Sequence, residues 1–125
     1  MPATKILIID DEEKFCRSLK KALEIRSIFN VLTATRGDEG IRLAKIHKPD
    51  VILLDVMMPG MAGTHVAEDL LEDPTTRSIP IIFVTAIVKD EELKKSGGIM
   101  GGRSFIAKPI MIGELIKAIN ATLFR

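Results

Sequence analysis

Short apolar blocks alternate along the chain with longer segments in which apolar residues recur at helical spacing. The apolar blocks occupy residues 6–9, 31–34, 51–54, 81–84 and 105–107. Three of them are nearly continuous and rich in β-branched residues, the pattern typical of strands buried on both faces of a parallel sheet. The blocks therefore predict five short strands.

One-sided apolar faces between the blocks predict amphipathic helices. The three clearest faces consist of Phe15, Cys16, Leu19, Ala22 and Leu23, of Val66, Ala67, Leu70 and Leu71, and of Ile112, Leu115, Ile116, Ile119 and Leu123. A weaker pattern around Gly40 predicts a helix that starts after Gly37 and Asp38 and ends before Lys48. Strands that alternate with helices in this way predict an α/β fold, a doubly wound five-stranded parallel sheet with helices on both faces.

The leading topology for this sheet is the flavodoxin-like strand order 2-1-3-4-5. In such sheets the functional crevice lies at the carboxyl ends of the strands, so the residue after each apolar block is a candidate for chemistry. Residues of types that suit phosphoryl chemistry follow four of the blocks: Asp10 and Asp11 the first, Asp55 the third, Thr85 the fourth and Lys108 the fifth.

Strands 1 and 3 are neighbours in this order, about 4.8 Å apart, which brings three carboxylates into one crevice. Carboxylates this close repel one another unless a cation lies among them. Mg²⁺, a hard cation that prefers oxygen ligands, suits such a site. With the Lys108 ammonium and the Thr85 hydroxyl in the same crevice, the set suits phosphoryl transfer to a carboxylate nucleophile.

Each feature taken alone also has a structural interpretation. The acidic run 10–13 would then simply cap a helix and complement its dipole. The block 51–54 followed by Asp55 is similar to the Mg²⁺-binding strand of P-loop nucleotide triphosphatases, but the chain has no G-x-x-x-x-G-K-[ST] motif. Thr85 would end a strand and Lys108 would be a solvated lysine. The conjunction of four suitable strand ends favours the functional interpretation.

These residues resemble the motifs of response regulator receiver domains, the phospho-accepting modules of two-component signalling. The resemblance extends over the whole chain and rests on Asp10-Asp11, Asp55-Val-Met-Met-Pro-Gly, Thr85-Ala86 and Lys108-Pro109. It implies that residues 1–125 form one receiver domain, with Asp55 as the phosphoacceptor and Mg²⁺ as the cofactor. Among the metal ligands, it implies that Asp11 binds directly, Asp10 mostly through water, and Asp55 and the backbone carbonyl of Met57 complete the set.

The resemblance implies further roles at the ends of the last two strands. Thr85, the Ala86 amide and Lys108 hold the phosphoryl oxygens. Thr85 and Phe105 act as switch residues for the face formed by the fourth helix, the fifth strand and the fifth helix. The peptide bond before Pro109 is expected to be cis.

The resemblance implies a signalling switch, which catalyses only its own phosphorylation and dephosphorylation, and a histidine kinase or phosphotransfer protein as partner. A second copy of the phosphorylated chain and a downstream protein are further candidate partners. The nearly balanced charge, 18 Lys and Arg against 17 Asp and Glu, gives no reason to expect nucleic acid or a membrane as partner. The single cysteine, Cys16, and the lack of a signal-like or membrane-length apolar run predict a cytoplasmic location.

Two other classes compete with a signalling receiver. A haloacid-dehalogenase-like phosphatase also uses an aspartate nucleophile with Mg²⁺, but it requires a second acid two residues later, where this chain has Met57. A receiver that has lost its chemistry would act as a phosphate-independent interaction module, and the intact set of site residues argues against this. A stand-alone regulator and a domain of a longer protein both fit the resemblance.

The chain departs from the usual receiver pattern in its loops. Ala62 replaces an acid or amide, which predicts a local loss of turn hydrogen bonding. Four glycines within residues 97–102 predict a short fourth helix with a mobile C-terminal end, because each glycine costs about 1 kcal/mol relative to alanine. The resemblance implies that the side chains of Met57 and Ile87 flank the path of the attacking water. Neither side chain can orient a water, which predicts a long-lived phosphoryl group.

Overall fold

The computed structural model describes residues 3–26, 28–58, 60–86, 99–100 and 103–124. Its elements are, in chain order, β1 Thr4–Ile9, α1 Glu13–Glu24, β2 Phe29–Ala34, α2 Gly37–His47, β3 Val51–Asp55, α3 Gly63–Glu72, β4 Ile81–Thr85, β5 Ile99–Met100, β6 Arg103–Ala107 and α5 Ile112–Leu123. Every predicted apolar block lies within a strand. Of the predicted fourth helix and its glycine-rich end, residues 88–98, 101 and 102 fall outside the described residues, as do Pro59 and Ile87, whereas Ile99 and Met100 form β5.

The strands form one sheet with the order β2-β1-β3-β4-β6-β5. The first five strands in this order are mutually parallel, so the predicted parallel sheet with order 2-1-3-4-5 is confirmed, β6 being the predicted fifth strand. β5 was not predicted: it pairs antiparallel with β6 at the sheet edge.

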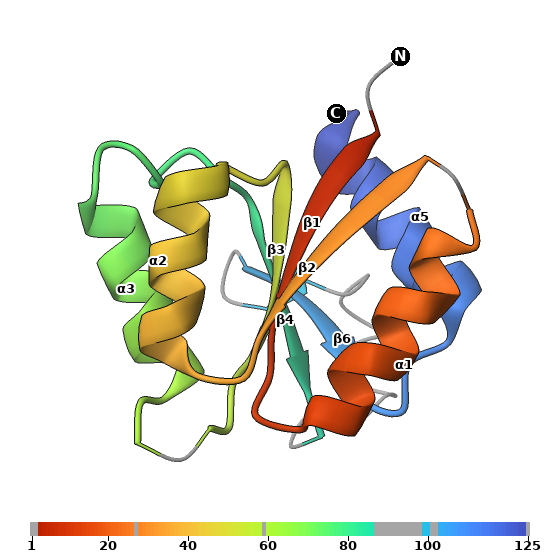
Figure 1. Ribbon diagram of the computed structural model, residues 1–125, viewed down its shortest axis with the longest axis horizontal. Helices are drawn as coiled ribbons and strands as arrows, with labels where there is room; N and C mark the ends of the chain where they lie inside the picture. Colours follow the sequence, from red (N-terminus) through yellow and green to blue (C-terminus); the bar gives the residue numbers. More distant parts are fainter. Residues whose placement is uncertain (1–2, 27, 59, 87–98, 101–102, 125) are drawn as a thin grey trace.

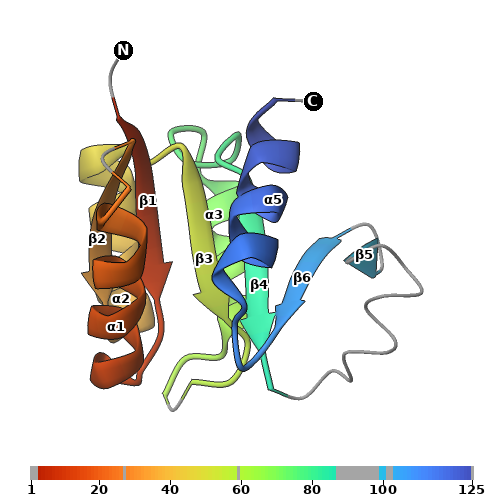
Figure 2. The ribbon, with the colours of Figure 1, turned by 90° about the vertical axis from the view of Figure 1, so that its right-hand side faces the viewer.

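Helices cover both faces of the sheet, with α2 and α3 on one side and α1 and α5 on the other (Figure 1). Because strand side chains alternate between faces, Ile6 and Ile8 pack under α1 and α5, whereas Leu7 and Ile9 pack under α2 and α3. Cys16 is buried in the first of these cores, as predicted. The carboxyl ends of the parallel strands lie at the edge of the sheet opposite the two chain termini (Figure 2).

The start of α2 differs from the prediction. The helix begins at Gly37 rather than after Asp38, because two acidic residues in its first turn complement the positive end of the helix dipole. It ends at His47 as predicted, where Lys48 adopts a left-handed φ of 46° and donates its N–H to the Ala44 carbonyl. None of the helices among the described residues is long and apolar enough to span a membrane.

Candidate functional site

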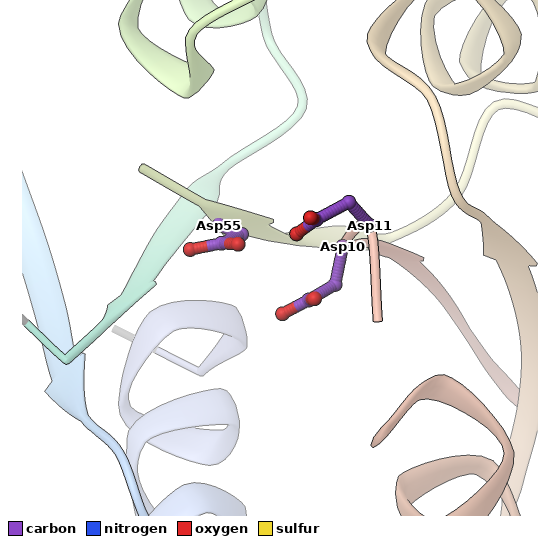
Figure 3. A group of neighbouring side chains, drawn as sticks. All are labelled: Asp10, Asp11 and Asp55. Atoms are coloured by element: carbon purple, nitrogen blue, oxygen red, sulfur yellow. The ribbon is translucent and has the colours of Figure 1, made fainter. Parts of the chain in front are cut away.

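Three aspartate carboxylates from two neighbouring strands converge at the carboxyl edge of the sheet (Figure 3). Ile9 of β1 pairs with Leu54 of β3, so the residues that follow them, Asp10 and Asp55, lie side by side. Asp10, Asp11 and Asp55 each offer an oxygen within 4.8 Å of the others. Asp10 and Asp55 are only 1% and 5% exposed, whereas Asp11 faces solvent. The predicted cluster of carboxylates therefore forms, with two of its members buried.

Asp10 and Asp55 are oriented by the same local device. The Oδ1 atom of Asp10 accepts the backbone N–H of Glu12 at 2.9 Å, and the Oδ1 atom of Asp55 accepts the N–H of Met57 at 3.2 Å. A side chain that accepts an N–H two residues ahead stabilises a tight turn after the strand. In both aspartates the Oδ2 atom is the one that faces Lys108.

Cys16 supports the backbone beneath this turn. Its Sγ atom donates to the Asp10 carbonyl at 3.3 Å from the first turns of α1. Burial, with a further contribution from the Asp10 carboxylate, raises the pKa of Cys16 to about 11. The thiol therefore keeps the proton that it donates at neutral pH, and Cys16 acts as part of the core rather than as a reactive group.

Lys108 is the cation that faces the carboxylates. Its Nζ atom lies 2.7 Å from Asp10 Oδ2, 3.3 Å from Glu12 Oε1 and 3.9 Å from Asp55 Oδ2. It also lies 4.4 Å above the centre of the Phe15 ring. Asp10 Oδ2 is buried and accepts no regular hydrogen bond from the described residues, so the ion pair with Lys108 is what balances its charge there.

The charges in the crevice shift the pKa values of two of these groups. Burial, followed by repulsion from Asp10, raises the pKa of Asp55 to about 6. Burial by itself would lower the pKa of Lys108, but the contacts with Asp10, Asp55 and Glu12 outweigh burial and raise it. Lys108 is therefore charged at neutral pH, and the free carboxylates remain crowded.

This set of donors fits a hard divalent cation such as Mg²⁺. It offers three carboxylates at close range, and the Oδ2 atom of Asp10 is buried without a regular hydrogen bond from the described residues. Repulsion from Asp10 is, after burial, the second cause of the raised pKa of Asp55, and a cation among the carboxylates would relieve that repulsion.

The remaining predicted site residues lie around this cluster. Thr85 is buried at the end of β4, beside Ala107 of β6, and its carbonyl accepts the N–H of Lys108 at 3.0 Å. Ala86 follows as an exposed residue, and the Lys108–Pro109 bond is cis. The side chain of Met57 is 61% exposed. Of these residues, Ala86 and Pro109 line one pocket together with Lys108 and Glu12.

Phe105 lies apart from the carboxylates. It pairs with Phe83 across β4 and β6, and the two rings stack with centroids 5.1 Å apart and an angle of 24° between their planes. Phe105 is half-buried and packs against the core under α2 and α3. Phe105 is linked to the site along β6, which leads to Lys108, and through Phe83, which lies two residues before Thr85 in β4.

Sequence reasoning missed two residues that contact Lys108. Glu12 belongs to an acidic run whose local pattern indicates only helix capping, and Phe15 belongs to an apolar helix face. Both contact a lysine more than ninety positions away, 96 in the case of Glu12, so no local signal identifies them.

Comparison with known proteins identifies the class. The sequence model of the response regulator receiver domain matches residues 6–120. Protein PilH of Pseudomonas aeruginosa is 40% identical over 120 residues, which cover 95% of this chain and 97% of PilH. The solved structure of chemotaxis protein CheY4 of Vibrio cholerae is 26% identical with a TM-score of 0.81, covering 97% of this chain and 99% of that one.

Receiver sequences also occur within longer relatives. The alkaline phosphatase synthesis transcriptional regulatory protein PhoP of Bacillus subtilis is 38% identical over 122 residues, and the match covers 97% of this chain but 49% of PhoP. Fold, site and sequence together define a signalling module of two-component systems. The chain belongs to the response regulator receiver domain family.

Proposed function

We propose that Asp55 accepts a phosphoryl group from a partner histidine kinase or phosphotransfer protein, with Mg²⁺ as cofactor. The observation that carries the proposal is the convergence of three carboxylates within 4.8 Å, with the Lys108 ammonium 3.9 Å from Asp55 Oδ2. A nucleophile, a place for a divalent cation and a fixed positive charge thereby meet at one edge of the sheet. The cytoplasm is the proposed location.

In the proposed transfer, one carboxylate oxygen of Asp55 forms a bond to phosphorus. The bond from phosphorus to the donor nitrogen of a phosphohistidine breaks, and the electron pair stays with the imidazole. The reaction requires Asp55 as the carboxylate, and with a pKa of about 6 it is mostly ionised at neutral pH even before a cation binds. Lys108 neutralises charge on the phosphoryl oxygens as they arrive.

Asp10, Asp11, Asp55 and the backbone carbonyl of Met57 would hold the cation. When bound, Mg²⁺ supplies positive charge to the phosphoryl oxygens and relieves the repulsion among the carboxylates. The Thr85 hydroxyl and the Ala86 amide would bind the remaining phosphoryl oxygens, since both residues lie at the end of β4 beside Lys108. Each of these groups binds or orients, and Asp55 alone forms the covalent bond.

Thr85 and Phe105 are proposed to carry the signal to the surface that includes β6 and α5. Thr85 is tied to β6 through its pairing with Ala107 and through the Lys108 N–H, so a shift at Thr85 is transmitted to the strand that holds Phe105. The packed position of Phe105 on Phe83 would then be one of two states whose populations change on phosphorylation. A second phosphorylated copy or a downstream protein would recognise the change.

Incubation of the protein with acetyl phosphate and Mg²⁺, followed by intact-protein mass spectrometry, tests the proposal. We expect one acid-labile phosphoryl group on the wild-type chain, and none on Asp55→Asn or in EDTA. Asp11→Ala should be modified more slowly. Multiple turnover of the donor would indicate a phosphatase, and a lack of modification would indicate an interaction module without this chemistry.

A further inference from the structure

Glu12 occupies a helix-capping position but uses its side chain for something else. It is the N-cap residue of α1, where Ser, Thr, Asp or Asn normally caps the first turn, and its side chain caps no backbone N–H among the described residues. Its backbone is fixed at both ends, because its N–H donates to Asp10 Oδ1 and its carbonyl accepts the N–H of Cys16. From this fixed point its carboxylate accepts a hydrogen bond from Lys108 Nζ at 3.3 Å.

The contacts of Lys108 place its ammonium on the α1 side of the crevice. Asp10 at 2.7 Å and Glu12 at 3.3 Å are its nearest anions, and Asp55 is farther away at 3.9 Å. The Phe15 ring lies beneath it on the same side, at 4.4 Å. A phosphoryl group on Asp55 would attract the ammonium from this side of the crevice toward Asp55.

Asp10 and Glu12 differ in what happens once a cation is bound. Asp10 belongs to the group of carboxylates that can share a metal ion, so a cation there would weaken its attraction for Lys108. Glu12 is not a member of that group, and its side chain is 65% exposed. Its negative charge therefore remains available to Lys108 in the metal-bound site.

We infer that Glu12 is a positioning residue that keeps the Lys108 ammonium away from Asp55. It thereby lowers the affinity of the site for a phosphoryl group on Asp55. The inference rests on the proposed phosphorylation of Asp55. In this role Glu12 competes with the phosphoryl oxygens for the same ammonium, and it thereby affects how readily Asp55 becomes phosphorylated. Because Glu12 is exposed, the competition is moderate and decreases as salt screens the pair.

Titration with beryllofluoride, which mimics the phosphoryl group, tests the inference in the presence of Mg²⁺. Two-dimensional NMR is the suitable measurement, since the chain has no Trp and no Tyr to report by fluorescence. Glu12→Gln keeps the size of the side chain and its backbone contacts but removes the charge. Glu13→Gln is the matched control, because Glu13 is the neighbouring acid and its ion pair with Arg17 is a long, exposed one of 3.9 Å.

We expect Glu12→Gln to tighten beryllofluoride binding by about two- to five-fold relative to Glu13→Gln, the range of an exposed ion pair. In a Lys108→Gln background this difference between the two variants should disappear, because the effect of Glu12 acts through Lys108. In EDTA, the side-chain NMR signals of Lys108 should shift with Glu12→Gln and not with Glu13→Gln. This last measurement involves neither the metal nor the phosphoryl group.

Three results would overturn the inference. Equal affinities of Glu12→Gln and Glu13→Gln would show that only the net charge matters. A gain that persists in the Lys108→Gln background would show that Glu12 acts on the anion directly. Unchanged Lys108 signals in EDTA would show that the contact does not position the ammonium. A wild-type chain that binds no beryllofluoride would instead refute the proposed function, and this inference with it.

Discussion

Gly63 approaches the backbone of Asp55 so closely that a β-carbon at residue 63 would overlap the Asp55 carbonyl oxygen. The same β-carbon would lie 2.8 Å from the Cα atom of Val56, whose carbonyl accepts the Gly63 N–H at 3.0 Å. The first residue of α3 thus packs directly on the strand end that carries the proposed phosphoacceptor. Backbone atoms cannot rotate away as a flexible side chain can, so only glycine fits at this position.

Gly63→Ala should therefore destabilise the protein by about 2 kcal/mol or more, as overpacking of a rigid site does. The variant should also lose phosphorylation, because the Asp55 backbone must shift. Gly113→Ala is the control: it lies in the first turn of α5, and a β-carbon there meets no described atom within 4 Å. Chemical denaturation should show Gly113→Ala to be neutral or slightly stabilised; equal losses in both variants would contradict the steric argument.

Ala62 leaves the N-terminus of α3 without a side-chain cap among the described residues. Its extended backbone, with φ −62° and ψ 147°, is already that of an N-cap residue. Ala62→Asn should therefore stabilise the protein by about 1 kcal/mol, because the amide oxygen can accept an N–H from the first turn. Ala62→Gln, with the same amide on a longer side chain, serves as the control in thermal unfolding. A gain as large with Gln as with Asn would argue against capping.

Asp55 should make the stability of the metal-free protein depend on pH. Its pKa is raised from 3.8 to about 6, so the folded chain holds the proton more tightly than the unfolded chain. The contribution of protonated Asp55 to the free energy of unfolding is therefore fully present below about pH 4, and it is lost as the pH rises through about 6. In EDTA, Asp55→Asn should raise the melting temperature relative to wild type near neutral pH, and the gain should vanish at acid pH.

Excess Mg²⁺ provides the complementary measurement on the same pair of proteins. Wild type should gain more melting temperature from the metal than Asp55→Asn, because the cation neutralises the charge that destabilises the empty crevice. In EDTA, Asp55→Asn could raise the melting temperature by the same amount at acid and at neutral pH. That result would mean that burial of the Asp55 carboxylate carries no electrostatic cost.

Met57 should lengthen the lifetime of the phosphoryl group. Its side chain is 61% exposed, directly beyond Asp55, and a thioether cannot orient a water for attack on phosphorus. Met57→Asn should accelerate loss of phosphate by about ten-fold, the effect on the rate of one hydrogen bond worth about 1.4 kcal/mol in the transition state. Phosphate release after removal of acetyl phosphate measures the rate, and Met57→Leu, which is equally unable to orient water, should decay like wild type. Similar rates for Asn and Leu would contradict the role.

The sequence determined much of the fold and of the site, because the two patterns that predict them are local. Continuous apolar blocks predict buried parallel strands, and all five blocks lie within strands of the predicted order. The residues that follow those blocks lie at one edge of a parallel sheet, which is why Asp10, Asp55 and Lys108 could be grouped before any coordinates. The departure at Ala62 could likewise be located from its place in the loop.

Only the tertiary structure decided how the grouped residues contact one another. Lys108 lies nearer to Asp10 than to Asp55, and it is also held by Glu12, 96 positions away in sequence. The demand for glycine at residue 63 arises from the backbone of β3, not from its neighbours in the chain. Strand-end rules locate residues to within one sheet spacing, about 4.8 Å. The distances from Lys108 Nζ to Asp10 and to Asp55 differ by little more than 1 Å. Which of the two carboxylates lies nearer therefore depends on packing across the whole domain.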